Sequence, residues 1–552
     1  MSTAQDTRGP TRYFLRKFSR FAILVAAGGC AMGACSDGYG NLRPTSLLVV
    51  HLQSGNVGSP SARLPLALGA AASFTVHIEA HRADGSIDTS FNGQVRISSK
   101  PGTVATTAER TVTLQSGVAD QAPVDILAAF GNTRIWAEDL GYVPVDPNRP
   151  APPQCSDGKD NNGNDKIDFP NDPGCYSPID DSEDGGTYIS GTSEPIYFVL
   201  PRIADVRGVA SGGAATTFPN EQVSMDTGYD ESSNSFSHSV VVTRISPTGF
   251  FATDIDDPRG FSSVMAYNFS APPLLRVCDR LRSFAGTASD FYGFTEINYP
   301  AWDTDEWQPT VPNSRTCLVP DPTILNIGAI GNTQGLFRYE SGLVRVCTAG
   351  HCCPQGCPTT DANNQPISAQ QQKECQDQKA LCEANEAAAI TPTAGLHVTG
   401  HFGQDLPQPP SYAPTDTATN CDLNNDGKVD FSTPPESTCA NACDADVECT
   451  EFSNFRQRSE FFLVLTDSSN NSSAKIQVDA SQAAASFNPV AKRGTAITAF
   501  TGSLTYFSGG SAFTLEARCD RDIITDPQAS PLPMDQACVQ PITLAANNAG
   551  SN

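Results

Sequence analysis

RVCDRLRSFAGTASDFYGFTEI, at Arg276–Ile297, returns near the C-terminus of this 552-residue chain as a degenerate copy, RGTAITAFTGSLTYFSGGSAFTL, at Arg493–Leu515. A shift of 216 residues pairs Leu281 with Ile497, Phe284 with Phe500, Gly286 with Gly502, Phe291 with Phe507 and Gly293 with Gly509. A slip of three residues then aligns Phe294 with Phe513. Each copy has alternating apolar residues, a Gly at a bend, an aromatic turn and a second alternating run. A duplicated β-unit is therefore predicted.

The composition indicates a mainly β protein of three or more domains, because Gly (44) and Pro (41) are frequent and helix-periodic segments are few. The formal net charge is −25. The first 34 residues carry five basic groups and only Asp6, so their removal gives −25 − 4 = −29. Such a surface repels nucleic-acid phosphates and suits a solvated extracellular protein that holds divalent cations. Acidity for solubility alone is the alternative.

The N-terminus has the features of an export signal. A basic region precedes an apolar run, Phe21–Ala34, that is too short to span a bilayer. The sequence before Cys35, Met-Gly-Ala, resembles the bacterial lipobox, which implies that Cys35 is acylated and becomes the mature N-terminus. Cys30 is the rival site, but it would leave 17 cysteines, whereas Cys35 leaves 16 to pair. We therefore expect a lipid-anchored protein of the cell envelope, in the outer membrane or at the cell surface.

Export implies an oxidising compartment, so the remaining cysteines are predicted to form disulfides. They fall into local groups of even number, and bonding is expected inside each group. The groups are Cys155 with Cys175, Cys278 with Cys317, six from Cys347 to Cys382, four from Cys421 to Cys449, and Cys519 with Cys538. Pairing within the two larger groups stays open. A helix predicted at Ser368–Ala389 puts Cys375 and Cys382 on one face.

Zinc is the alternative for the six-cysteine group, which also contains His351. Adjacent cysteines in an exported chain favour disulfides instead. His397 and His401 share one face of a strand or short helix and are a second metal candidate, but because they are isolated a surface or core role is favoured for them.

The expected domain boundaries follow from changes of composition along the chain, and the fold of each domain follows from the resemblances given below. The domains are a lipoprotein signal at 1–34, a tether at 35–44, a β-sandwich at 45–147, a Pro/Asp-rich connector at 148–186, a first β-barrel at 187–325, a second at 326–527 and a tail at 528–552. The second barrel carries a Cys-rich helical insertion at 348–393 and a Cys-rich loop at 416–453. The sandwich pattern, exemplified by the alternation of Phe74, Val76 and Ile78, resembles bacterial Ig-like domains.

The first barrel resembles the OB-fold domains that accompany secreted bacterial nucleases. The resemblance rests on the GFF run at Gly249, a crossing strand that ends in Gly, and an aromatic-Gly turn before FTEI. The family has Gly-Asp where this chain has Cys278-Asp279, so a disulfide replaces a tight turn. In the second copy, ESGLVRV resembles the family's first strand and FF at Phe461 corresponds to FF at Phe250. The expected architecture is an Ig-like sandwich followed by two OB-like barrels.

Two Asp-rich segments have the ligand spacing of calcium loops. In CDLNNDGKVDF, oxygen ligands occupy positions 1, 3, 5, 7 and 9, as in EF-hand and dockerin loops. They are Asp422, Asn424, Asp426, the carbonyl of Lys428 and Asp430. Gly427 permits the sharp turn. Position twelve is Thr433 rather than Glu, so a bidentate ligand must come from elsewhere, with Glu436 as a candidate.

The connector repeats this spacing and resembles the Asp-rich repeats of thrombospondin-type proteins. Its candidate ligands are Asp160, Asn162, Asn164, the carbonyl of Lys166 and Asp168. Asp165 stands where Gly is usual, and Asp tolerates the left-handed conformation better than most residues. Asp157 and Asp172 are further candidate ligands. The alternative for both segments is a solvated Asx-rich turn; Ca²⁺ is the cofactor that we predict.

No nucleophile elbow, phosphate-binding Gly loop or HExxH motif is present, so we expect no enzyme. The predicted role is a non-catalytic, calcium-stabilised, lipid-anchored scaffold or binding protein with a protein or polysaccharide partner. The alternative is an extracellular protein that binds single-stranded nucleic acid or assists a nuclease. Its bases would stack on Phe250, Tyr292, Phe294 and Tyr506 beside Arg276, Arg280 and Arg282. The negative charge disfavours it.

Overall fold

The computed structural model describes residues 46–539 with gaps. The gaps are 106–110, 142–144, 146–150, 164, 173, 176, 184–187, 214, 309–310, 312–314, 355, 358, 360–365, 367, 388–392, 400–432, 439–458, 469–472, 484–486, 488–493, 508–511 and 535–537. The signal segment, Cys35, Asn164, His401, the loop at 422–430 and its four cysteines therefore lie outside the described residues. Within them the protein is mainly β, as predicted. None of the helices in these ranges combines the length and apolar character that a membrane crossing needs.

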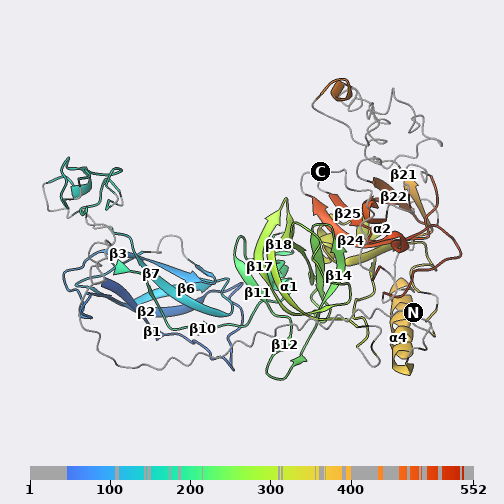
Figure 1. Ribbon diagram of the computed structural model, residues 1–552, viewed down its shortest axis with the longest axis horizontal. Coiled ribbons are helices and arrows are strands. Elements are labelled where there is room, and N and C mark those ends of the chain that lie inside the picture. The colour runs from blue at the N-terminus through green and yellow to red at the C-terminus, as the bar shows by residue number, and fades with distance from the viewer. Residues whose placement is uncertain are drawn as a thin grey trace, which may run out of the picture. The chain divides into compact units, whose positions relative to one another are not determined.

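The first domain is a sandwich of two sheets around one core (Figure 1). One sheet has the order β4-β6-β2-β1-β8, formed by Thr103–Val104, Val118–Leu127, Ala72–His81, Ser46–Ser54 and Tyr188–Ile189. The other has the order β10-β7-β3-β5, with β9 on β7, formed by Ile196–Tyr197, Asn132–Asp139, Gln94–Lys100, Thr111–Thr113 and Gly191–Thr192. The predicted alternation in β2 is confirmed, because Phe74, Val76, Ile78 and Ala80 are all buried.

The sandwich takes in a segment that follows the connector. β8 pairs in parallel with β1, whereas β9 and β10 pair antiparallel with β7. The sandwich therefore extends to Tyr197, beyond the boundary between connector and barrel that the sequence predicts at 187. Two-residue strands have no alternating pattern, so the sequence gives no sign that they return to the earlier sheets.

The next domain is a closed five-stranded barrel (Figure 1). Its strands are β14 (Val240–Ser246), β15 (Gly249–Asp254), β16 (Ser263–Tyr267), β17 (Arg280–Phe291) and β18 (Phe294–Asp305). Antiparallel pairs join β14 to β15, β15 to β16, β18 to β17 and β17 to β14, and a parallel pair joins β16 to β18. One apolar cluster, which includes Val242, Phe250, Phe284 and Ile297, fills its interior.

Short elements surround this barrel. β11 (Gln222–Met225) extends the sheet beside β17, and β12 (Tyr229–Asp230) pairs with β13 (Ser235–Phe236) in a separate hairpin. The short helices are η1 (Gln154–Ser156) in the connector, α1 (Ile203–Val206) and η2 (Val209–Ser211).

The second barrel repeats the strand order of the first, but its first strand is split. β20 (Leu343–Cys347) pairs with β24 (Ala499–Phe507), whereas β21 (Gly395–Thr399) pairs with β22 (Glu460–Thr466). β22 pairs with β23 (Ser473–Asp479), which runs parallel to β25 (Ala512–Glu516), and β25 pairs with β24. The predicted insertion at 348–393 thus lies between the two halves of one strand.

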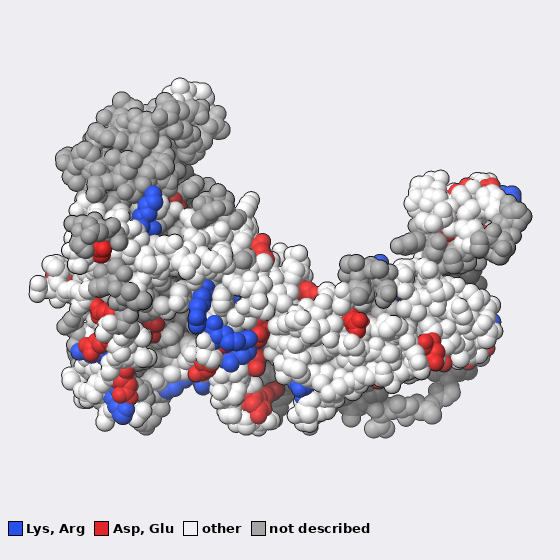
Figure 2. Space-filling model, turned by 180° about the vertical axis from the view of Figure 1, so that it is seen from behind, with Lys and Arg blue, Asp and Glu red and all other residues white. Residues whose placement is uncertain are grey.

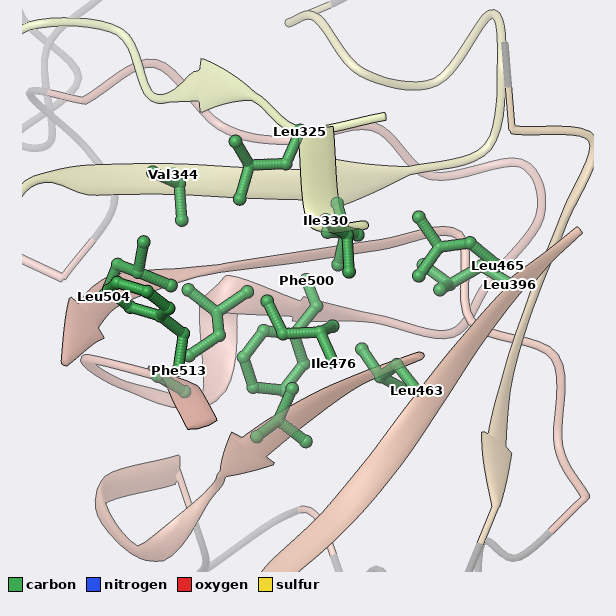
Figure 3. Packing of buried hydrophobic residues seen from close by; sticks show 14 of the residues in the cluster. Leu325, Ile330, Val344, Leu396, Leu463, Leu465, Ile476, Phe500, Leu504 and Phe513 are labelled. Atoms are coloured by element: carbon green, nitrogen blue, oxygen red, sulfur yellow. The ribbon is translucent and has the colours of Figure 1, made fainter. Parts of the chain in front are cut away.

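The core of the second barrel is apolar and continuous (Figure 3). It gathers side chains from β20 to β25 and from α2 (Ile327–Ile330), of which Leu463, Phe500 and Leu515 are fully buried. The remaining short elements are β19 (Thr323–Ile324), α3 (Thr333–Leu336), η3 (Phe337–Tyr339), η4 (Ser481–Ala483), η5 (Asp520–Asp522) and β26 (Ile523–Ile524).

The insertion contains α4, Ala369–Ala387, close to the predicted helix (Figure 1). Disulfides join Cys353 to Cys382 and Cys357 to Cys375, so both helical cysteines bond to the preceding loop. The other described disulfides are Cys155–Cys175, Cys278–Cys317, Cys347–Cys352 and Cys519–Cys538. All six lie inside the predicted groups, and none of the described cysteines of the six-cysteine group is left as a thiolate for zinc.

The registers of the two barrels correct one detail of the repeat. Ala288 pairs with Ile297 in the first barrel, and Leu504 pairs with Leu515 in the second. The shift is 504 − 288 = 216 on one strand and 515 − 297 = 218 on the next, so the slip is two residues rather than three. Phe513 therefore corresponds to Thr295, inside the barrel, whereas Phe294 lies on the outer face. A one-residue change of register moves a side chain to the opposite face.

Candidate functional sites

The connector is a small acidic loop closed by the Cys155–Cys175 disulfide. From residue 155 to residue 183 it has eight acidic residues and two lysines. Asp165 has φ 63°, the left-handed conformation that the calcium-loop spacing requires at this position. Asp160 accepts hydrogen bonds from the backbone N–H groups of Gly163 and Asp165, at 2.7 and 2.9 Å. The backbone thus turns tightly around the first candidate ligand.

Three other carboxylates of the connector are buried. Asp172, Asp180 and Glu183 have at most 1% of their surface exposed. Glu183 accepts from the backbone N–H groups of Asn161 and Asp168, which links the end of the connector to its middle. In addition, Oδ1 of Asp168 is enclosed without a hydrogen-bond partner. Buried carboxylates normally need a compensating cation, and an unsatisfied oxygen costs free energy.

The candidate ligands of the connector have the donor type that calcium prefers, but their side chains do not converge on one point. All candidate ligands are oxygen donors, which Ca²⁺ prefers. However, among the described residues no three acidic or imidazole groups converge on a point that could hold a metal. The second loop lies outside the described residues, apart from its flank, where Glu436 is buried.

A second candidate site is the outer face of the first barrel, on β16, β17 and β18. Cross-strand register puts six side chains on this face next to Ala266, Ala288 and Ile297, because these three alternate residues point into the core. The outward residues are Met265, Tyr267, Thr287, Ser289, Glu296 and Asn298. We call this set the β16–β18 face.

Glu296 lies in the middle of this face. It is 9% exposed, and its cross-strand neighbours are Met265 and Ser289, which are uncharged. Burial raises the pKa of its carboxyl to about 7, and no hydrogen bond or charge opposes this shift. Two residues along the strand, Nδ2 of Asn298 donates to Oγ of Ser289 at 2.7 Å, while its Oδ1 is buried without a partner. The face therefore presents one enclosed acceptor without a partner, Oδ1 of Asn298, and a largely buried carboxyl at Glu296.

Exposed aromatic rings lie at one end of the face. Phe269 and Tyr299 are 60% and 73% exposed, and their ring centroids are 5.3 Å apart. Tyr267 packs edge-on against Phe269 at 4.7 Å. Both exposed residues have left-handed backbones, with φ 59° at Phe269 and 50° at Tyr299. This conformation is uncommon for bulky residues and is concentrated at functional sites.

A second aromatic group lies where the β17–β18 hairpin meets the second barrel. Phe291 and Tyr292 form the turn, with ring centroids 4.8 Å apart, and Tyr292 lies 5.5 Å from Phe507 of β24. All three rings are more than half exposed. Beside them, Phe294 is buried in a small cluster that Tyr506 contacts.

These positions correct the predicted nucleic-acid platform. Phe250 is fully buried inside the barrel and Phe294 is 5% exposed, so neither can stack on a base. Tyr292 is exposed as expected. The arginines are paired: Arg276 with Glu306, and Arg280 and Arg282 with Asp305. On the face shown in Figure 2, basic side chains form small groups that lie close to acidic ones.

Sequence reasoning missed Glu296, Asn298, Phe269 and Tyr299. The available signal was the alternation in FTEIN, where polar residues at every second position indicate an outward face. That signal does not tell whether a polar side chain is hydrated or enclosed by neighbouring strands. Of the histidine pair, His397 lies on β21 and is half-buried. Among the described residues, no group of three or more His, Cys, Asp or Glu residues that could hold a metal forms around it.

Comparison with known proteins gives no assignment: no protein-family model matches the chain, and neither a curated protein nor a solved structure shows a match.

Proposed function

We propose that this chain is a non-catalytic, lipid-anchored protein of the cell envelope that acts as a scaffold or binding protein. The observation that carries the proposal is the combination of six described disulfides with exposed aromatic rings on the face where Oδ1 of Asn298 is enclosed without a partner. Disulfides of this number indicate an oxidising compartment. Exposed aromatic groups with a few polar atoms are typical of binding surfaces.

The lipid anchor is tested by labelling. The full chain is expressed in a bacterial host with a labelled fatty acid, alongside the Cys35→Ser and Cys30→Ser variants. Label in the wild type and in Cys30→Ser, but not in Cys35→Ser, supports the anchor. Label that persists in Cys35→Ser would show that Cys35 is not the modified residue. If the label were then lost in Cys30→Ser, Cys30 would be the lipidated residue.

Calcium is proposed to stiffen the connector. The left-handed Asp165, the buried Asp172, Asp180 and Glu183, and the unsatisfied Oδ1 of Asp168 support it. In the bound state Asp160, Asn162, Asn164, the Lys166 carbonyl and Asp168 would supply oxygens, and the ion would neutralise the excess negative charge. The segment at 422–430 would hold a second ion by the same ligand spacing.

Thermal unfolding tests the metal, because a ligand that binds only the folded state raises Tm. We expect a higher Tm in millimolar calcium than in chelator, and a smaller difference for Asp168→Asn. Asp230→Asn is the matched control, since Asp230 caps a turn through Ser232 in the exposed β12–β13 hairpin. Equal melting curves in calcium and chelator would exclude the metal.

The fold of each domain belongs to the same proposal. We infer an Ig-like sandwich and two OB-like barrels, because the strand order of the closed first barrel, with its one parallel pair, recurs in the second with its first strand split into β20 and β21. This topology also favours the second candidate function, binding of single-stranded nucleic acid. The buried Phe250 and Phe294 and the paired arginines weigh against it. Retention of a labelled oligonucleotide on a filter at low salt would reverse that preference.

A further inference from the structure

The outer face of the sheet β4-β6-β2-β1-β8 carries three of the chain's seven histidines. On β2, His77, Glu79 and His81 alternate with buried apolar residues and therefore point outward. On β1, His51 is the register partner of His77. Side chains directly opposite each other on antiparallel strands have Cβ atoms about 5 Å apart. At this spacing, the imidazoles of His51 and His77 can both reach one ion.

A carboxylate holds Nδ1 of each of these two rings. Nδ1 of His51 lies 3.0 Å from Oε1 of Glu194, whose other oxygen accepts from the backbone N–H of Leu52. Nδ1 of His77 lies 2.9 Å from Oδ1 of Asp120. An imidazole that donates its Nδ1–H to a carboxylate keeps Nε2 for a metal, and such a contact is typical of metal-ligating histidines. Both rings are therefore oriented as ligands.

Glu79 supplies oxygens next to His77. Its Oε1 lies 2.9 Å from Nε2 of His77, and its Oε2 lies 2.6 Å from Nε2 of His81. In the structure these groups hydrogen-bond to one another, and no three acidic or imidazole side chains of the described residues converge on one point. His77 contacts a carboxylate with each ring nitrogen, and an ionised carboxylate only accepts, so both nitrogens carry a proton. A metal ion would replace the Nε2 proton, which would pass to solvent.

We propose that this face of the sandwich binds a divalent transition-metal ion through Nε2 of His51, Nε2 of His77 and a carboxylate oxygen of Glu79. Two imidazoles and one carboxylate are a zinc ligand set that leaves a fourth position open. The side chains of His77 and Glu79 are 23% and 22% exposed, so ions reach them from solvent. The site goes beyond the proposed binding role. It shares no residue with the connector or the lipid anchor, so each test can fail alone.

An ordinary surface contact between a histidine and nearby acids is the competing explanation, and His238 on the first barrel exemplifies it. Its Nε2 lies 3.8 and 4.0 Å from carboxylate oxygens of Asp226 and Asp254. However, the same nitrogen lies closest to the backbone carbonyl of Asp226, at 3.2 Å. His238 thus has acidic neighbours without a carboxylate on Nδ1, which makes it the matched control.

The experiment is calorimetric titration of Zn²⁺ into the full oxidised chain, after treatment with chelator and dialysis into millimolar calcium. Calcium occupies oxygen-only sites, so zinc that still binds reports nitrogen ligands. We expect saturable binding to the wild type and at least a tenfold loss of zinc affinity in His51→Gln and in His77→Gln. Asp120→Asn keeps all three ligands but weakens the contact that orients His77, so it should lower the affinity about tenfold.

Two further variants locate the ion. His81→Gln can still donate to Glu79 and keeps the pair of His51 and His77, so it should retain the wild-type affinity. His238→Gln should also retain it. Zinc binding that is absent from the wild type, or that survives in both His51→Gln and His77→Gln with native circular dichroism spectra, would overturn the proposal. Loss of binding in His81→Gln with retention in His51→Gln would place the ion away from the cross-strand pair and would overturn it too.

Discussion

Arg207 and Glu340 form a fully enclosed ion pair, with NH1 2.9 Å from Oε1 and neither side chain exposed. Arg207 follows α1 of the first barrel, and Glu340 immediately precedes the second. The guanidinium also donates to the carbonyls of Ser263, Phe337 and Glu340. This one side chain therefore links strand β16 to the segment that leads into β20.

Removal of one partner should be costly because it leaves a buried charge. We expect Arg207→Met to destabilise the chain by about 3 to 5 kcal/mol in denaturant unfolding. The double variant Arg207→Met/Glu340→Leu should recover part of this loss. Arg96→Ala, which breaks the exposed pair with Glu138, is the control and should change stability by less than about 1 kcal/mol. A small effect of Arg207→Met would mean that water reaches the pair.

Much of this architecture could be predicted from the sequence, in the segments where apolar residues recur at regular spacing over many positions. The duplicated unit, the alternation in β2, the helix at 369–387 and the disulfide groups all depend on local patterns. The pairing of β8 to β10 with the sandwich could not be predicted, because two-residue strands are defined only by their partners. Glu296 escaped for the same reason: the exposure of an outward residue on β18 depends on neighbours from other strands, such as Met265 on β16, and not on its own segment.

Gly286 and Gly502 are equivalent in the repeat and should be equally intolerant of a side chain. A Cβ at Gly286 would lie 2.4 Å from Cγ2 of Ile297, and one at Gly502 would lie 2.3 Å from the carbonyl oxygen of Glu516. We expect Gly286→Ala and Gly502→Ala each to cost roughly 1 to 3 kcal/mol in denaturant unfolding, as overpacked sites do. Gly69→Ala is the control, because nothing lies within 4 Å of its Cβ position. Equal stability of all three variants would contradict the close approach.

Reduction should unfold the insertion before the barrels. Helix α4 is polar and largely exposed, so its place depends on the Cys353–Cys382 and Cys357–Cys375 disulfides. Helices in proteins gain most of their stability from packing of an apolar face, which this polar helix does not have. In mild reductant we expect protease to cut within 369–387 first, while β20 to β25 stay protected. Cleavage in the barrel core at the same rate would show that these bonds stabilise the whole domain.

The left-handed backbone at Asp165 makes its substitutions diagnostic. Asp165→Gly should be neutral or slightly stabilising, because Gly adopts φ 63° without strain. Asp165→Val should destabilise the connector by about 1 to 2 kcal/mol, since branched residues rarely adopt this conformation. For each of the two variants, Tm is measured as a function of calcium concentration, and the concentration that gives half of the maximal shift is compared. A stronger calcium response in Asp165→Val than in Asp165→Gly would exclude a turn of the predicted kind.

Glu296 should make stability fall as pH rises. Burial raises the pKa of its carboxyl from the ordinary 4.5 to about 7, so the folded state holds a proton that the unfolded state releases between these values. The stabilisation by this proton is complete below pH 4.5 and is lost as pH increases towards 7. Glu296→Gln cannot titrate and should exceed the wild type by up to about 3 kcal/mol at pH 8, but match it at pH 4.5. When the two chains are compared at each pH, the contributions of other buried acids, such as Glu340, to the free energy of unfolding cancel. A difference that is constant across this range would show that the carboxyl is hydrated in the folded state.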